Sequence, residues 1–386
     1  MVKKGIIWLH KWLGIFSGVI VFILSITGCL YVFQDELKLL SYPERYYIRD
    51  GASTQAPQAI SKLISIAQGA LAEEERISRV DLYPARDRTW IFRAAKVDEE
   101  AFGHWNYQKY YKRVFINPYS GEVQAIENTK YEFFQIVLQL HLNLLLGKKV
   151  GHPLVGMSTL IFTVLLLSGI VLWWPKKWRW KSLKKRLTLS FKVNRRRVVY
   201  DLHNVSGFYA LLVALVFAVT GLAFAYPDFK NIYVSGFNVF DKKEVNTPTQ
   251  RPEAKIHTLN DAVAYSLRTH PGADMMSLRL KSDADKQDIQ VRLQKDRTGD
   301  FVWYYFNLKD GSLENVKSDD TNRLGDQIGA MNYDLHVGNF WGFGTKILYF
   351  FMSLICASLP VTGYIMWANK GKKKKANRTA RTIVQI

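Results

Sequence analysis

Residues 200–221 read YDLHNVSGFYALLVALVFAVTG, and residues 8–28 read WLHKWLGIFSGVIVFILSITG. Each stretch has a histidine near its start, His203 or His10, and then an apolar run. A bilayer core takes about 20 helical residues, so both runs are long enough to cross it. In both, a Thr-Gly pair begins 17 residues after the histidine, or roughly 25 Å along an α-helix. The two stretches predict membrane helices with matched polar residues at both ends.

The composition agrees with a membrane protein, since 48% of the 386 residues are hydrophobic although the net charge is +20. Apolar runs predict four spans, at about residues 6–33, 153–174, 202–226 and 346–367. The first run is too long for a signal peptide and is followed by Gln34-Asp35-Glu36 without a cleavage site. We therefore expect an uncleaved anchor.

The basic residues predict the orientation of the chain. The N-terminal residues, the loop at 175–200 and the tail after Ala368 carry 21 basic residues and, counting Asp201, one acidic residue. Basic flanks mark the cytoplasmic side. Both termini are thus expected in the cytoplasm, with two loops of about a hundred residues outside. Topology and contact with anionic lipid explain these basic runs, so no nucleic-acid partner is expected.

A second pair of histidine segments indicates an internal duplication. LQLHLNLLLG at 138–147 places a glycine six residues after His141, and YDLHVGNFWG at 333–342 does the same after His336. Further on, Ser168-Gly169 and Thr362-Gly363 each precede a tryptophan by the same spacing. The chain is therefore read as a direct repeat with an offset of 193–195 residues.

The two outer loops repeat as well. Each has a helix-like stretch, at 56–72 and 259–270, followed by segments of alternating hydrophobicity and a glycine turn. This order predicts a small α+β module in each loop. A connector is expected at about 240–252.

The predicted fold class is an α-helical membrane protein, a four-span bundle with internal duplication and two small α+β periplasmic modules. The expected segments are 1–34 (first span), 35–132 (first module), 133–175 (interfacial segment and second span), 176–201 (basic cytoplasmic loop), 202–227 (third span), 228–330 (second module), 331–368 (interfacial segment and fourth span) and 369–386 (basic tail).

The repeat also predicts which histidines meet. Direct repeats of this topology are related by an axis along the membrane normal, so equivalent residues face each other at one depth. His10 and His203 are expected to pair at the inner side, and His141 and His336 near the outer surface. Two imidazoles facing across a bundle provide axial ligands for a haem, so two b-type haems are expected. The simpler alternative is that each histidine is an interfacial anchor.

The ordered segments LHKWLG…TG, LH…G…SGIVLWWP, LH…G…TG and LHVG…G…TG, with α+β modules between them, resemble the PepSY-associated transmembrane family. That family includes FoxB-like ferrisiderophore reductases of the bacterial inner membrane and iron-regulated membrane proteins. The resemblance covers nearly the whole chain. It implies four spans, haem in the membrane and reduction of ferric siderophores in the periplasm, which makes the protein a haem-dependent oxidoreductase.

Several alternatives stay open. His152 could replace His141 as a ligand, and His141 could lie on a continuous or an interfacial helix. The chain has no dinucleotide-binding or P-loop motif, so the electron donor is expected to be a separate cytoplasmic reductant or a membrane quinol. One rival function is a haem-free sensor or protease regulator. Another is an iron-chelate permease, which the lack of carboxylates and arginines in the spans disfavours.

Overall fold

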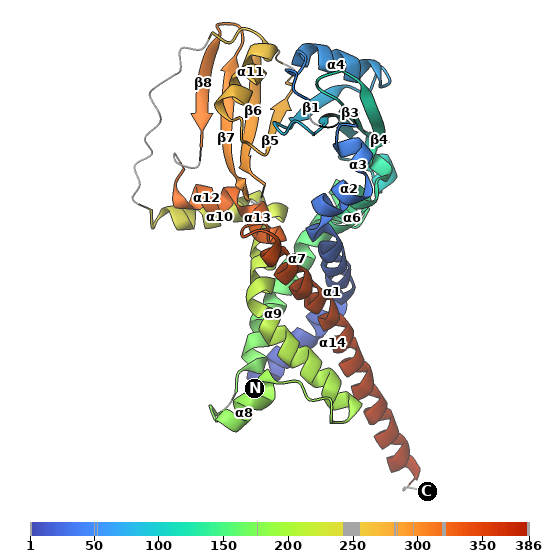
Figure 1. Cartoon of the computed structure of the whole chain (residues 1–386). Helices are drawn as coiled ribbons and strands as arrows, with labels where there is room; N and C mark the ends of the chain where they lie inside the picture. The colour runs from blue at the N-terminus through green and yellow to red at the C-terminus, as the bar shows by residue number, and fades with distance from the viewer. Residues whose placement is uncertain are drawn as a thin grey trace.

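The computed structural model describes residues 2–49, 51, 53–175, 177–241, 255–281, 283, 285–295, 297–318 and 322–383. A helical bundle carries a head that contains a β-sheet (Figure 1). Most of the connector predicted at 240–252 lies outside the described residues.

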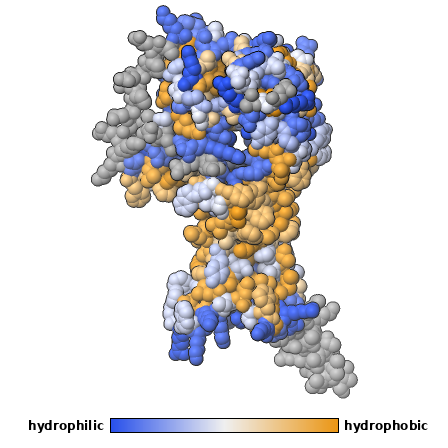
Figure 2. Space-filling model, viewed as in Figure 1, coloured by the Kyte–Doolittle hydropathy of each residue, from blue (hydrophilic) through white to orange (hydrophobic). Residues whose placement is uncertain are grey.

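Four long helices form the bundle, and they agree with the four predicted spans. Each is long and apolar enough to cross a membrane. Figure 2 shows a largely apolar waist between a hydrophilic lower end and a hydrophilic head. Their bounds are α1 (Val2–Val32), α7 (Lys148–Trp173), α9 (Arg195–Ala225) and α14 (Phe343–Ile383), of which residues 343–369 are the apolar span.

His141 and His336 do not lie on the spans themselves. His141 is on the short helix α6 (Phe133–Asn143), and the chain leaves it through left-handed Leu144 and Leu145 before α7 begins. His336 is on α13 (Asn332–Val337), which ends at left-handed Gly338. A side chain at Gly338 would place its Cβ 2.6 Å from the Tyr349 ring, so this close turn requires glycine. The question of a continuous or an interfacial helix is thus answered in favour of a separate helix.

The head contains one eight-stranded antiparallel sheet, so the two predicted α+β segments share a single sheet. Each repeat supplies four strands, and the two halves join where β1 pairs with β5, for example Val80 opposite Leu278. An edge strand leaves backbone groups unpaired, and this pairing satisfies both inner edges. The order is β4-β3-β2-β1-β5-β6-β7-β8, with bounds β1 (Ile77–Leu82), β2 (Trp90–Val97), β3 (Gln108–Ile116), β4 (Val123–Asn128), β5 (Met275–Arg279), β6 (Lys286–Gln294), β7 (Arg297–Asn307) and β8 (Ser312–Lys317).

The main core of the head lies on one face of this sheet. Helices α4 (Ile60–Gly69) and α11 (Leu259–Thr269) pack there on buried side chains such as Phe92 and Leu278. Between the sheet and the bundle lie α2 (Gln34–Ser41), α3 (Pro43–Tyr46) and α13 (Figure 1). The remaining short elements are α5 (His104–Tyr107), η1 (Thr129–Tyr131), α8 (Trp180–Leu187), α10 (Pro227–Asn238) and α12 (Leu324–Ala330).

Candidate functional site

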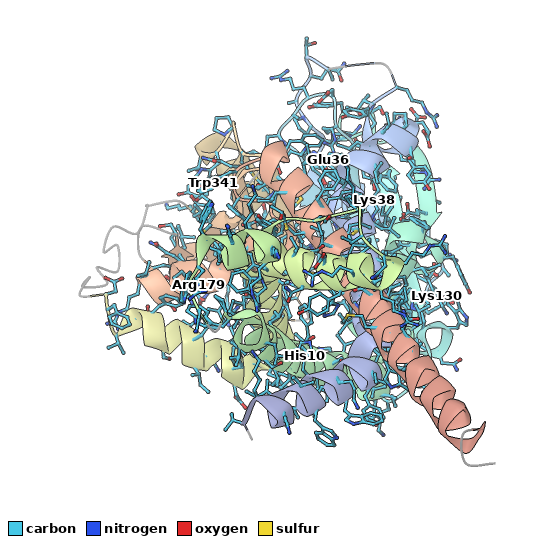
Figure 3. The ribbon with its side chains drawn as sticks, turned by 90° about the horizontal axis from the view of Figure 1, so that it is seen from below. His10, Glu36, Lys38, Lys130, Arg179 and Trp341 are labelled. Carbon is cyan, nitrogen blue, oxygen red and sulfur yellow. The ribbon has the colours of Figure 1, made fainter. Side chains whose placement is uncertain are left out.

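The bundle brings the four predicted histidines together as two pairs. The ring centres of His10 and His203 lie 6.3 Å apart, and those of His141 and His336 lie 6.0 Å apart. The first pair is at the end of the bundle that carries the N-terminus, seen from below in Figure 3 with His10 labelled. The second is next to the head. Each pair therefore contains one histidine from each repeat.

We call the His10–His203 pair the inner level and the His141–His336 pair the outer level. At the inner level, both histidines are held through Nδ1. His10 Nδ1 lies 2.8 Å from the Ser168 hydroxyl of α7. His203 Nδ1 lies 2.9 Å from the Thr362 hydroxyl of α14 and 3.1 Å from the carbonyl oxygen of Leu359. Each ring is thus fixed by a neighbouring span.

The outer level repeats the arrangement with hydroxyls of the other two spans. His141 Nδ1 lies 2.9 Å from the Thr27 hydroxyl of α1, and His336 Nδ1 lies 2.7 Å from the Thr220 hydroxyl of α9. The equal Thr-Gly spacing on α1 and α9 thus has a structural meaning. Each of these helices contributes a histidine to the inner level and a supporting hydroxyl to the outer level.

These contacts define the tautomer. Each of the four hydroxyls donates its proton to a backbone carbonyl of its own helix, for example Thr27 to Ile23 at 2.7 Å and Thr362 to Ser358 at 2.9 Å. A hydroxyl whose proton is used in this way accepts the Nδ1 proton of the histidine. The Nε2 lone pair is then free, which is the state a metal-ligating imidazole requires.

Glycine follows every supporting hydroxyl and keeps the space beside the ring open. A Cβ built on Gly28, Gly169, Gly221 or Gly363 would lie 3.6 to 3.7 Å from the Cε1 atom of the histidine held by the preceding residue. The sequence showed these glycines, but their partners are residues of other helices. The repeated Ser/Thr-Gly pair was the available signal, and only the packing shows which histidine each pair serves.

The paired rings fit a haem. Imidazoles that ligate one iron from opposite sides, with metal–nitrogen bonds of about 2 Å, have ring centres roughly 6 Å apart. Among the described residues no group of three His, Cys, Asp or Glu side chains could hold a metal ion. One turn beyond His10, a Cβ on Gly14 would meet only Leu165, at 3.8 Å. Gly14 therefore leaves room for one more carbon atom beside Leu165 on this side of the inner pair.

The outer histidines are neutral. Burial lowers the pKa of His141 to about 4 and that of His336 to about 3. Only the neutral imidazole has a lone pair for a metal, so the surroundings favour the form that binds.

The other histidines have different neighbours. His152 lies in the first turns of α7, outside both ring pairs. His104 is buried, and its Nε2 lies 3.0 Å from the Lys130 carbonyl oxygen. His270 Nε2 lies 2.7 Å from the Tyr304 hydroxyl. Lys346, which occupies the repeat position of His152, forms a 2.7 Å ion pair with Glu36.

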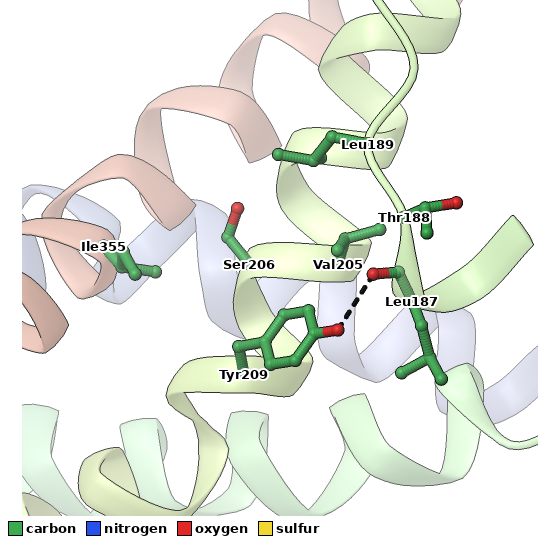
Figure 4. Close-up of a pocket in the computed structure, with 7 residues that line it drawn as sticks. All are labelled: Leu187, Thr188, Leu189, Val205, Ser206, Tyr209 and Ile355. Carbon is green, nitrogen blue, oxygen red and sulfur yellow. Dashed lines mark hydrogen bonds between the residues drawn. The ribbon is translucent and has the colours of Figure 1, made fainter. Parts of the chain in front are cut away.

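An apolar groove of about 560 Å³ opens beside the inner pair. Val205 and Ser206, just after His203 on α9, line it together with Ile355 of α14 (Figure 4). The end of α8 and the two residues after it line one side, where the Tyr209 hydroxyl donates to the Leu187 carbonyl oxygen at 3.0 Å. The basic loop between α7 and α9 therefore folds back against a span.

Comparison with known proteins agrees with this architecture. No curated protein matches the chain. The model of the PepSY-associated TM region matches residues 7–370, from the start of the first span to the end of the fourth. The chain is therefore a membrane protein that belongs to the PepSY-associated transmembrane family.

Proposed function

We propose that the protein is a di-haem b oxidoreductase of the bacterial inner membrane that passes electrons outward to a periplasmic acceptor. The observation that carries this proposal is the state of the four histidines. They face each other in two pairs, each with Nδ1 engaged and Nε2 free. Interfacial anchors need neither ring pairing nor a supporting hydroxyl on a different helix.

The charge distribution supports the direction of transfer. The basic loop and tail belong to the end of the bundle that holds the His10–His203 pair, and basic flanks face the cytoplasm. The head then lies in the periplasm, above the His141–His336 pair. Electrons would enter at the inner pair and leave at the outer pair.

Haem bound at each level would supply one-electron chemistry through its iron. The chain holds and orients the ligands through Ser168, Thr362, Thr27 and Thr220. Between the two levels, Leu166, Ala210, Ala214, Ala218 and Cys356 form a tightly packed apolar cluster. This cluster fills the middle of the bundle, so an electron would pass from one haem site to the other through packed side chains.

The groove beside His203 favours a lipid-soluble donor. Its lining is largely apolar, and the chain has no dinucleotide-binding motif. A quinol would release two electrons and two protons and become a quinone. Each electron would convert one ferric chelate to the ferrous form outside. A ferric siderophore as that acceptor follows from the family resemblance, and hard oxygen ligands hold the less charged Fe(II) more weakly.

The direct test is the visible spectrum of the purified protein, oxidised and then reduced, with haem counted per chain. Two haems are expected, and one each after His10→Ala, His203→Ala, His141→Ala or His336→Ala. His152→Ala serves as the matched control and should keep both haems. A preparation that binds no haem, even when haem is supplied during expression, would contradict the proposal and favour the sensor function.

A further inference from the structure

Four arginines form a row across the middle of the sheet. Arg113 on β3 lies opposite Arg93 on β2, Arg93 lies opposite Arg79 on β1, and Arg79 lies opposite Arg279 on β5. Their neighbours along the strands, such as Val80, belong to the core under α4 and α11. Since side chains alternate between faces, all four arginines lie on the opposite face. The row crosses the junction of the two repeats.

Such a row is unfavourable for folding by itself. Like charges directly opposite each other destabilise a sheet. Two carboxylates compensate in part. Asp81 forms ion pairs with Arg79 at 3.1 Å and with Arg93, and Glu127 lies 3.7 Å from Arg113. Four guanidinium groups therefore share two carboxylates, which leaves a positive excess.

The row also has unused hydrogen-bond donors. The Nε atoms of Arg93 and Arg113 are buried and have no hydrogen-bond partner. The whole Arg113 residue is only 9% exposed. Arg279 lies 4.6 Å over the Trp303 ring and, within the described part of the chain, has no ion pair. Exposure rises from buried Arg113 to exposed Arg279. The row thus runs from the surface into the protein.

The inner end of the row lies near the end of α1 that faces the head. The phenol of Tyr31, near the end of α1, is within electrostatic range of Arg93 and Arg113. Tyr31 follows Thr27, which holds His141, by four residues, or roughly 6 Å along the helix. The inner end of the row thus faces α1, the span that holds His141.

We propose that this arginine row is the acceptor site and that it binds a metal chelate with a net negative charge, through carboxylate or other anionic oxygens. The role of the row as acceptor site rests on the proposed function. The binding of anions rests on the arginines alone. A guanidinium presents paired N–H donors that match carboxylate oxygens, which makes a row of them selective for anionic over neutral chelates.

Binding can be measured separately from electron transfer with gallium(III) citrate, because gallium(III) has the charge of ferric iron and is not reduced. The full chain in detergent is titrated with this complex and with a neutral gallium(III) tris-hydroxamate. We expect the anionic gallium complex to bind more tightly than the neutral one. Its binding should weaken as salt is added, since ions screen the exposed part of the row.

The double variant Arg79→Gln/Arg279→Gln should bind gallium(III) citrate at least about tenfold more weakly, because hydrogen bonds to charged groups are lost. Arg268→Gln is the control, since this exposed arginine lies on α11 at the other face of the sheet. Thermal unfolding and haem content show whether the variants are folded.

Equal affinities of the double variant and the control would overturn the site. So would a wild-type chain that binds the neutral complex as tightly as the anionic gallium complex. A chain without haem that still binds the anionic complex would leave the site standing and remove the proposed function. A two-haem chain that does not bind the anionic complex would leave the proposed function standing and remove the site.

Discussion

Replacement of Thr27 by valine tests the link between the supporting hydroxyls and the histidines. Valine keeps the shape of threonine but cannot accept the Nδ1 proton of His141, which now lies 2.9 Å from the hydroxyl. An unpaired buried donor costs about 1–3 kcal/mol. Loss of the partner of a ligating histidine typically lowers metal affinity 10–100-fold. Both estimates predict that the outer haem binds about 10- to 100-fold more weakly in Thr27→Val.

The assay is transfer of haem from the protein to an excess of an apo-globin, followed by the Soret band. The variant should lose one haem early and keep the other, because the inner pair is roughly 25 Å away along α1. Thr163→Val is the matched control. Its hydroxyl also donates to a carbonyl one turn back, that of Thr159 at 2.9 Å, but supports no histidine.

Two results would refute this reasoning. If Thr27→Val and Thr163→Val lose haem at the same rate, the hydroxyl does not support the ligand. If Thr27→Val loses both haems together, the two levels are not independent.

Three further outcomes are expected. Gly169→Val should remove the inner haem and keep the outer one in a haem count, because the methyl groups of valine would extend beyond a Cβ that already lies in contact, 3.6 Å from Cε1 of His10. Glu36→Gln should lower the thermal unfolding temperature more than Lys346→Met. The first leaves a lysine whose side chain is 6% exposed without its ion-pair partner, a loss of about 3–5 kcal/mol, whereas the second leaves a more exposed carboxylate; the reverse order would contradict this. Burial lowers the pKa of His104 from its ordinary value, so the unfolded chain takes up a proton at a higher pH than the folded one. The stability that His104 contributes is then present above about pH 6.5 and is lost as the pH falls, and His104→Gln should flatten that part of a stability profile measured by urea unfolding.

The sequence by itself determined the spans and the histidine pairs. A span is a local property, since about 20 consecutive apolar residues suffice to mark it. The pairs followed from the duplication, because a direct repeat places equivalent residues at one depth. His10 could thus be matched with His203, and His141 with His336, without coordinates.

Other features depended on contacts between residues that are distant in the chain. The packing of α1 beside α6 brings the Thr27 hydroxyl to His141. The fusion of the two sheets depends on the pairing of β1 with β5, and the arginine row depends on its register. A shift of one residue would turn Arg79 into the core. Local patterns do not encode such choices. They depend on which long-range packing buries the most apolar surface and pairs the inner edges β1 and β5 of the two halves.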